Sequence, residues 1–149
     1  MSKKYSVAGA NASQAAPATI ITLIGSTAIR PRCYDIDIGS SQTPADQAML
    51  IVFSRTTTTG TAGSNPTPMP LDPADIAAVC TAGQAHSSEP TYAATNLLNF
   101  GMNQRASYRW VAAPDSEFVG SATASNCLAL KIGTSTATLV MQATLLYFE

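Results

Sequence analysis

His86 is the only histidine in the 149-residue sequence, so it is the only imidazole available for catalysis or metal binding. A cupin-type metal site in a β-barrel needs several histidines, which excludes that use of the chain. A Ser-His-Asp triad would have to be built around His86. The stretch AHSSEP around it has no nucleophile-elbow signature and is typical of a surface loop. No phosphate-binding glycine motif, Cys-x-x-Cys or His-Glu-x-x-His stands elsewhere in the sequence, so we predict no enzyme and no cofactor.

Two acidic pairs are the remaining candidates for an ion site. Asp35 and Asp37 project from one face of a short segment, and Asp115 and Glu117 lie in a turn. Calcium takes roughly six to eight oxygen ligands, so each pair would be an incomplete site. We favour a solvated or arginine-paired face, with ion binding at either pair as the alternative.

Two arginines precede the first acidic pair. Arg30 and Arg32 have the opposite parity to Asp35 and Asp37, so pairing is expected across strands or subunits. We therefore place Arg30 and Arg32 at a possible interface with another subunit or another protein.

The stretch ASYRWVAA contains the aromatic residues that could bind sugar. Tyr108 and Trp110 share one face of an alternating segment and could form a stacking platform. Aromatic residues on an alternating strand more often pack in the core, which is our preferred interpretation.

The cysteines are predicted to be inert. Cys33, Cys80 and Cys127 are odd in number and too widely spaced for a zinc pattern. Free cysteine behaves as a small hydrophobic residue, so we expect buried thiols in a protein made in a reducing cytoplasm.

Charge is sparse and balanced. Charged residues are 11% of the chain, against about 25% in an ordinary soluble domain, and the net charge is −1. The 8 Lys and Arg residues are scattered, which argues against nucleic acid as the main partner. No stretch reaches the ~18 apolar residues of a membrane helix, and the start has no apolar run typical of a signal peptide.

Alternation of apolar and polar residues predicts an all-β fold. In the stretch 137–148, ATLVMQATLLYF, one parity from Ala137 to Tyr147 is apolar. At its end Leu146 and Phe148 make the second face apolar too, so we expect cover on both sides, with another subunit as one source. In CYDIDIG, Tyr34 and Ile36 are predicted to point inward. About eight to ten such segments separated by turns are typical of an antiparallel β-sandwich or barrel.

One short helix is predicted at DPADIAAVCTAG, residues 72–83. Asp72 is suited to cap it, Pro73 and Asp75 suit its first turn, and Gly83 would follow its end.

Residues 56–73, TTTTGTAGSNPTPMPLDP, read as ordered sheet with a loop rather than as a disordered linker. The run of threonines favours a strand, and GTAGSNP would join it to the next. Pro66, Pro68 and Pro70 lose their backbone donors on the same side, which suits an edge strand that offers no donors outward.

The first residues differ from the rest. Residues 1–18 are rich in Ala, Ser and Asn without a strong period. We predict an extended N-terminal arm, either disordered or laid across a neighbouring subunit, followed by a single β-sandwich domain over residues 19–149.

Several blocks are similar to a group of small structural proteins of tailed bacteriophages. They are GSTAIRPRCYDIDIGSSQTPADQA, PLDPADIAA, EPTYAATNLL and NQRASYRWVAAPDSE, in the same order, over about residues 25 to 149. The group resembles capsid decoration or cement proteins. The resemblance implies a jelly-roll-like sandwich, a homotrimer and a place on the outer head surface, but it carries no functional residue.

We therefore expect a virion structural protein that binds the major capsid protein and stabilises the shell, without nucleic acid or membrane. A low-charge surface can be buried on a partner without stripping water from many ions. The alternatives are a tail or head-fibre base protein, and a glycan-binding module that uses Trp110 or Tyr92.

Overall fold

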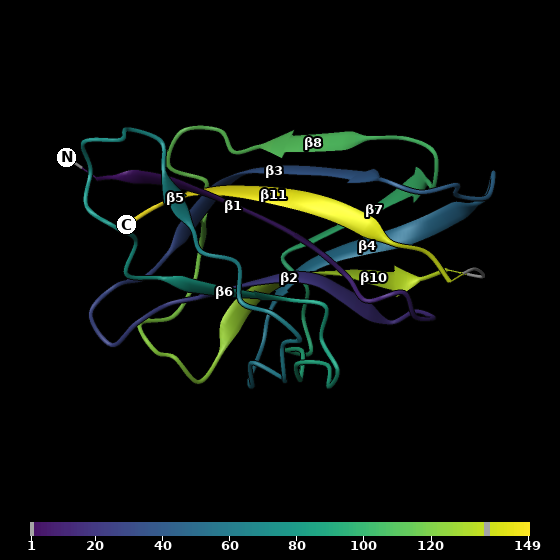
Figure 1. The fold of residues 1–149 in the computed structure, drawn as a ribbon, viewed down its shortest axis with the longest axis horizontal. Helices are drawn as coiled ribbons and strands as arrows, with labels where there is room; N and C mark the ends of the chain where they lie inside the picture. Colours follow the sequence, from purple (N-terminus) through teal and green to yellow (C-terminus); the bar gives the residue numbers. More distant parts are fainter. Residues whose placement is uncertain (1, 136–137) are drawn as a thin grey trace.

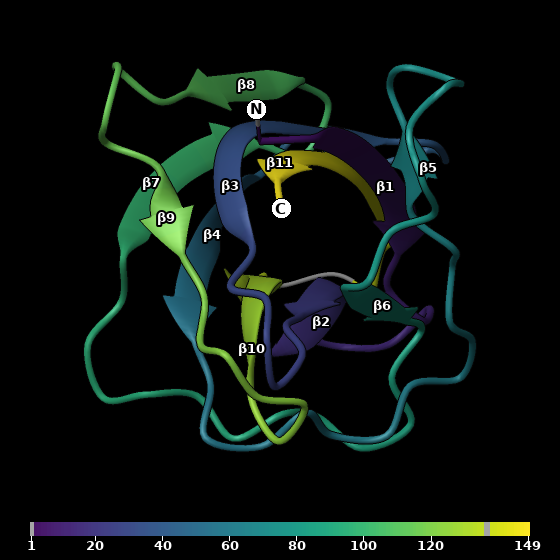
Figure 2. The same cartoon turned by 90° about the vertical axis from the view of Figure 1, so that its left-hand side faces the viewer.

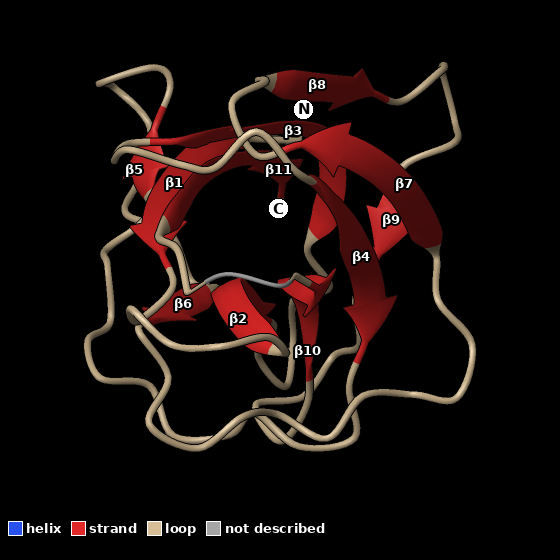
Figure 3. Cartoon of the chain, turned by 90° about the vertical axis from the view of Figure 1, so that its right-hand side faces the viewer, coloured by secondary structure: helices blue, strands red, loops and turns tan. Residues whose placement is uncertain are grey.

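The structure is a computed structural model that describes residues 2–135 and 138–149. Within these residues the chain forms 11 β-strands and no helix (Figure 3). The strands are β1 (Lys4–Ala10), β2 (Ala18–Ile24), β3 (Arg32–Ser40), β4 (Ala48–Arg55), β5 (Met69–Pro70), β6 (Thr81–Gln84), β7 (Leu98–Asn103), β8 (Tyr108–Val111), β9 (Phe118–Val119), β10 (Cys127–Thr134) and β11 (Met141–Phe148). The all-β prediction is confirmed.

The strands form two antiparallel sheets that face each other across one core (Figure 2). The six-stranded sheet has the order β5-β1-β11-β3-β8, and β9 also pairs with β3. The five-stranded sheet has the order β6-β2-β10-β4-β7. Early strands therefore pair with late ones: β1 with β11, β2 with β10, β3 with β8 and β4 with β7 (Figure 1).

Alternation along β11 places its apolar residues in the core, as predicted. The side chains of Met141, Ala143, Leu145 and Tyr147 are buried, and those between them are partly or fully exposed. Ala137, which belongs to the same prediction, lies outside the described residues. The core also contains side chains from strands that are apolar on both parities: Ile20, Ile21, Leu23, Ile51, Phe53, Leu128, Leu130 and Ile132.

A bulge overturns the predicted face of Tyr34. Ile36 is buried as expected, but the register between β11 and β3 shifts between Leu146 and Tyr147. Tyr147 is therefore opposite Cys33, and Cys33 is buried while Tyr34 is only half-buried. An extra residue in one strand exchanges the faces of the residues beyond it, and alternation alone does not reveal it.

The helix predicted over residues 72–83 does not form. The Asp72 carboxylate accepts a hydrogen bond from the backbone of Ala74 at 2.9 Å, so the capping interaction exists. Only a turn follows, because the chain must cross from β5 in one sheet to β6 in the other. The backbone N–H groups of Val79 and Cys80 instead bind the Glu149 carboxylate.

The arm predicted over residues 1–18 is wrong for most of its length. Lys4–Ala10 forms β1, which lies between β5 and β11 inside the six-stranded sheet. Tyr5 and Val7 are buried in the core. After the strand, the buried Asn11 donates to the Leu139 carbonyl at 2.8 Å and accepts from the backbone of Met141 at 2.7 Å.

The threonine run is ordered but is mostly not a strand. β4 ends at Arg55, and only Thr56 continues into an isolated bridge, with Tyr92. The loop that follows is joined to the end of β6 by the bridge of Ser64 with Gln84, and to the loop after β6 by the bridge of Thr61 with Ser88. These bridges join the segment to the rest of the fold, so it is not a linker between two domains.

All three cysteines are free and buried, as predicted. Burial raises the pKa of the Cys33 thiol to about 12 and that of the Cys127 thiol to about 11. Burial also raises the pKa of Cys80, with a further contribution from the Glu149 carboxylate. The described residues include no helix that is long and apolar enough to cross a membrane.

Candidate docking surface

The proline-rich segment lies at an edge of the six-stranded sheet, as the sequence predicts. Pro70 belongs to β5, the outermost strand, and is opposite Tyr5 of β1. The backbone of Leu71 donates inward to the Lys4 carbonyl at 2.9 Å. Pro68 is buried and Pro66 is half-buried just before the strand. Pro70 has no N–H to offer a further strand, so this edge does not favour extension of the sheet by another strand.

Exposed apolar side chains gather beside this edge. Among the described residues, five large hydrophobic side chains are exposed, and four lie between residues 69 and 79. Met69 is 64% exposed and Ile76 is 62% exposed, with Leu71 and Val79 near half. A concentration of apolar surface on a small domain marks an interaction site more often than scattered single residues do. The sequence did not reveal this cluster, and the helix predicted over residues 72–83 included Ile76 and Val79.

The backbone behind these side chains is held rigidly by polar contacts. The Tyr5 hydroxyl donates to the Ile76 carbonyl at 3.2 Å. The Glu149 carboxylate accepts from Val79 at 2.9 Å and from Cys80 at 2.8 Å. The polar groups of this irregular segment thus bind the first and last strands, and its apolar side chains remain outward.

A groove of about 530 Å³ crosses the outer face of the six-stranded sheet. Its floor comes from one end of β1, β3 and β11, where side chains are small. Asp37 is the one ionisable residue among those that line it. The lining residues are Ala8, Gly9, Ala10, Asp37, Ile38, Gly39, Ser40, Ser41, Gln84, Ser107, Gln142, Ala143 and Thr144.

The other half of this face is filled by larger side chains. The Phe148 ring lies 4.5 Å from that of Tyr34, measured between centroids, and Lys4 and Arg32 lie over it. Leu146 is half-buried on the same strand. The chain itself therefore covers much of the apolar end of β11. A neighbouring subunit had been one expected source of this cover.

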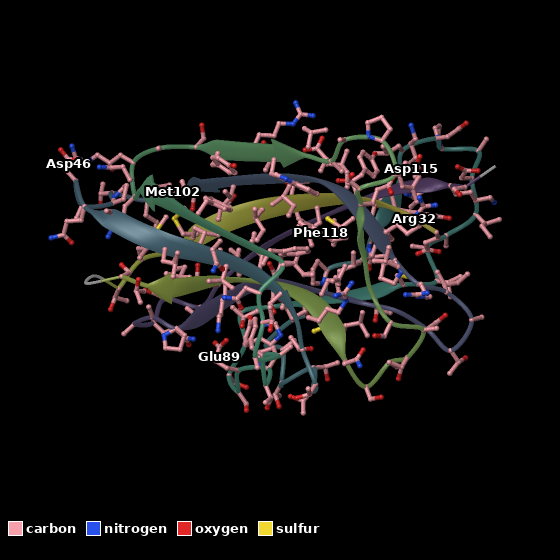
Figure 4. All side chains as sticks on the ribbon, turned by 180° about the vertical axis from the view of Figure 1, so that it is seen from behind. Arg32, Asp46, Glu89, Met102, Asp115 and Phe118 are labelled. Carbon is pink, nitrogen blue, oxygen red and sulfur yellow. The ribbon has the colours of Figure 1, made fainter. Side chains whose placement is uncertain are left out.

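Both arginines predicted at an interface have partners within the chain. Arg32 Nη2 donates to Glu117 Oε2 at 3.1 Å, and Arg30 Nε donates to the Gly120 carbonyl at 3.1 Å. The backbone amide of Glu117 and the Arg32 guanidinium lower the pKa of the Glu117 carboxyl. Arg32 is labelled in Figure 4 at the side of the molecule that also carries Asp115.

Asp35, one member of the first acidic pair, is arginine-paired across strands, as favoured from the sequence. Arg109 of β8 makes two hydrogen bonds to Asp35 of β3, at 3.0 Å and 2.6 Å. Asp35 is buried, whereas Asp37 is exposed beside the groove. No cluster of metal-ligating side chains occurs in residues 2–135 and 138–149, and the exposed Asp115 stands at a turn with φ of 62°.

The aromatic residues considered for sugar binding are packed against other rings. Trp110 stacks on Phe118 with centroids 4.4 Å apart, and Tyr108 stacks on Phe100 with centroids 4.0 Å apart. All four rings are partly buried against the core. One face of Trp110 and one of Tyr108 are therefore occupied, in line with the preferred packing interpretation.

Tyr92 belongs to a polar network on the five-stranded sheet. Its hydroxyl lies 2.7 Å from Thr19 Oγ1, and the Lys131 ammonium lies 3.7 Å from the centre of its ring. The Glu89 carboxylate, labelled in Figure 4, accepts hydrogen bonds from Thr19 and from Gln14. This network fixes the loop that contains Glu89 and Tyr92 to β2.

His86 is buried, contrary to the surface loop expected from AHSSEP. Its side chain is only 2% exposed, and neither ring nitrogen has a hydrogen-bond partner among the described residues. Its Nε2 lies 3.4 Å from the position that a Cβ on Gly83 would take. The His86 ring thus fills space between β6 and two loops, because the loop that follows Thr56 and the loop that follows β6 close over it.

Acid should destabilise the protein through His86. Burial lowers the pKa of His86 from its ordinary value of 6.5, so between that value and the lowered one the unfolded chain binds a proton that the folded chain does not. Stability is then lost as the pH falls below 6.5, with a slope of at most about 1.4 kcal/mol per pH unit. Urea unfolding at several pH values above 5 would measure it, and His86→Leu should flatten the slope. An equal slope in both proteins would contradict the prediction.

No family model, curated protein or solved structure matches the chain.

Proposed function

We propose that the two sheets form a jelly roll. A jelly roll is a two-sheet arrangement built from two Greek keys. The nested pairing of β1 to β4 with β11, β10, β8 and β7 supports this topology. In this reading β5, β6 and β9 are additions, and β1 and β3 lie in one sheet while β2 and β4 lie in the other.

We further propose that the chain is a virion structural protein that cements a capsid, with the outer face of its six-stranded sheet on the major capsid protein. The observation that carries the proposal is the 530 Å³ groove, which has small uncharged walls and a single carboxylate. Covering such a surface leaves few ions to be stripped of water. A stable contact needs about 800 Å² from each partner, and the chain exposes 7109 Å².

Binding to the assembled lattice explains how such a protein stabilises a shell. A protein that binds only the assembled form shifts the equilibrium towards it by mass action. The sequence resemblance to decoration proteins supports this role, and we propose the outer head surface as the location.

Two glycines have room for a Cβ atom, which gives the test. A Cβ at Gly39 would meet only the Cβ of Ser107, at 3.7 Å, and a Cβ at Gly101 on the other sheet would meet only a carbonyl oxygen, at 4.0 Å. Gly39→Arg should therefore fold normally and lose binding to empty heads of the same phage in co-sedimentation. Gly101→Arg is the matched control and should bind as the unmodified chain does. Equal binding by both variants would refute the use of the groove.

The place where the protein binds on the virion distinguishes the capsid role from the alternative role in a tail or head-fibre base. Gold-labelled protein should form a regular lattice over the heads in electron micrographs. A single spot at one vertex would favour the alternative, and no binding to any virion part would remove both.

A further inference from the structure

The exposed apolar residues lie at the two opposite edges of one sheet. Met69 and Leu71 mark the β5 edge, and Val111, 56% exposed, lies on β8 at the other edge (Figure 2). They are the ends of the order β5-β1-β11-β3-β8. The described residues have no other large hydrophobic side chain exposed to this degree apart from Ile76 and Val79, which adjoin the β5 edge.

The residues at both edges turn towards the same side of the sheet. Met69 is opposite Ser6, whose neighbours Tyr5 and Val7 point into the core, so Met69 lies on the outer face. Val111 is opposite Asp35 on β3, next to the inward-facing Ile36, and so it lies on the outer face too. Two copies placed edge to edge could therefore bring these side chains into one continuous apolar contact.

The charges at the two edges are opposite. Residues 66–80 contain Asp72 and Asp75 and no basic residue, and residues 104–112 contain Arg105 and Arg109 and no acidic one. Asp75 is 3.7 Å from Lys3, and Arg109 pairs with Asp35. Asp72 and Arg105 form no ion pair within the described part of the chain.

We propose that copies of this chain associate head to tail, with residues 66–80 of one copy against β8 and Arg105 of the next. The acidic apolar edge then meets the basic apolar edge, which places unlike charges together. A two-fold contact of either edge with itself would bring two acidic edges or two basic edges together, which is unfavourable.

A head-to-tail contact closes into a ring when the rotation that relates neighbouring copies brings the last copy back to the first. The prolines favour such a ring over a continuous sheet that runs through all copies. Pro70 denies a further strand its backbone donor, so the two edges meet through side chains and not through a shared hydrogen-bond ladder. The rigid backing of residues 76–80 by Tyr5 and Glu149 leaves little ordering to be done on association.

Native mass spectrometry and light scattering on the full chain test the contact. The unmodified chain should be a closed oligomer. Ile76→Arg places a cation against the basic edge and Val111→Asp places an anion against the acidic edge, so each should weaken association by about 100-fold or more. The double variant places these new charges opposite each other between neighbouring copies, so it should recover the oligomer.

Ala124→Arg, in an exposed loop before β10, is the matched control and should not change the mass. Circular dichroism of each variant reports whether it folds. A monomeric unmodified chain, a Val111→Asp variant that stays assembled, or a double variant that fails to recover while folded would each overturn the head-to-tail contact. This inference is independent of the capsid proposal: a monomer that still binds heads would refute only the inference, and an oligomer that binds no head would refute only the capsid role.

Discussion

Removal of residues 2–10 is expected to prevent the chain from folding. β1 is an inner strand, with β5 on one side and β11 on the other, so its loss would separate the proline edge from the rest of the sheet. It would also expose the core around Tyr147, which stacks on Tyr5. Domains of this size have about 5–15 kcal/mol of stability in total, and the loss of an inner strand exceeds that reserve. Circular dichroism and urea unfolding of the truncated chain would show no cooperative transition.

Point variants keep this prediction testable if the truncated chain aggregates. Val7→Ala removes two buried methyl groups and should reduce the free energy of unfolding by about 2 kcal/mol. Ala8→Ser, on the exposed face of the same strand, should change it by less than about 0.5 kcal/mol. A truncated chain that unfolds cooperatively with the stability of the full chain would show that β1 is a dispensable arm.

Strands in which large apolar and polar residues clearly alternate could be predicted from the sequence, whereas strands with few large apolar residues could not. β11 alternates large apolar residues with threonine and glutamine, so its buried face is evident. β1 has the sequence KYSVAGA, in which only Tyr5 and Val7 are large and apolar. Two such residues among Ala, Ser and Gly do not distinguish a strand from an arm, although the structure buries both.

Long-range contacts account for the other errors. Asp72 provides the cap that the predicted helix requires, yet helix formation is overridden by the Glu149 carboxylate, which lies 70 residues away from Val79. The bulge at Tyr34 depends on how β11 pairs with β3, and no local pattern encodes it. His86 lies in a short Ser-containing stretch, and its burial depends on a second loop that covers it.

Only one property of the candidate docking surface could be predicted from the sequence, namely the missing backbone donors at its proline-rich edge. The spacing of Pro66, Pro68 and Pro70 signalled an edge, because missing donors follow from residue type alone. The groove depends on small residues from three strands that only the register brings together. Arg30 and Arg32 were predicted at an interface because their parity is opposite to that of Asp35 and Asp37, and the fold supplies each arginine with an intrachain acceptor.

Substitution of Gly60 is expected to have the second large effect on stability. Gly60 has a φ of 66°, and a Cβ there would lie 2.4 Å from the Ser88 carbonyl oxygen. The left-handed conformation costs an alanine about 1–2 kcal/mol, and crowding of a packed site adds about 1–3 kcal/mol. Gly60→Ala should therefore lower the free energy of unfolding by about 2–5 kcal/mol in urea titrations.

Gly101→Ala is the matched control, because its Cβ would meet only the Met49 carbonyl oxygen at 4.0 Å and its φ is not in the left-handed region. Alanine restricts the unfolded chain more than glycine does, so this variant should be neutral or more stable by up to about 1 kcal/mol. The contrast isolates the close approach of the two loops over His86. If both variants unfold at the same urea concentration as the unmodified chain, the loops do not approach as closely as the structure places them. If only Gly60→Ala is destabilised, the loop that follows the threonine run is an ordered part of the fold.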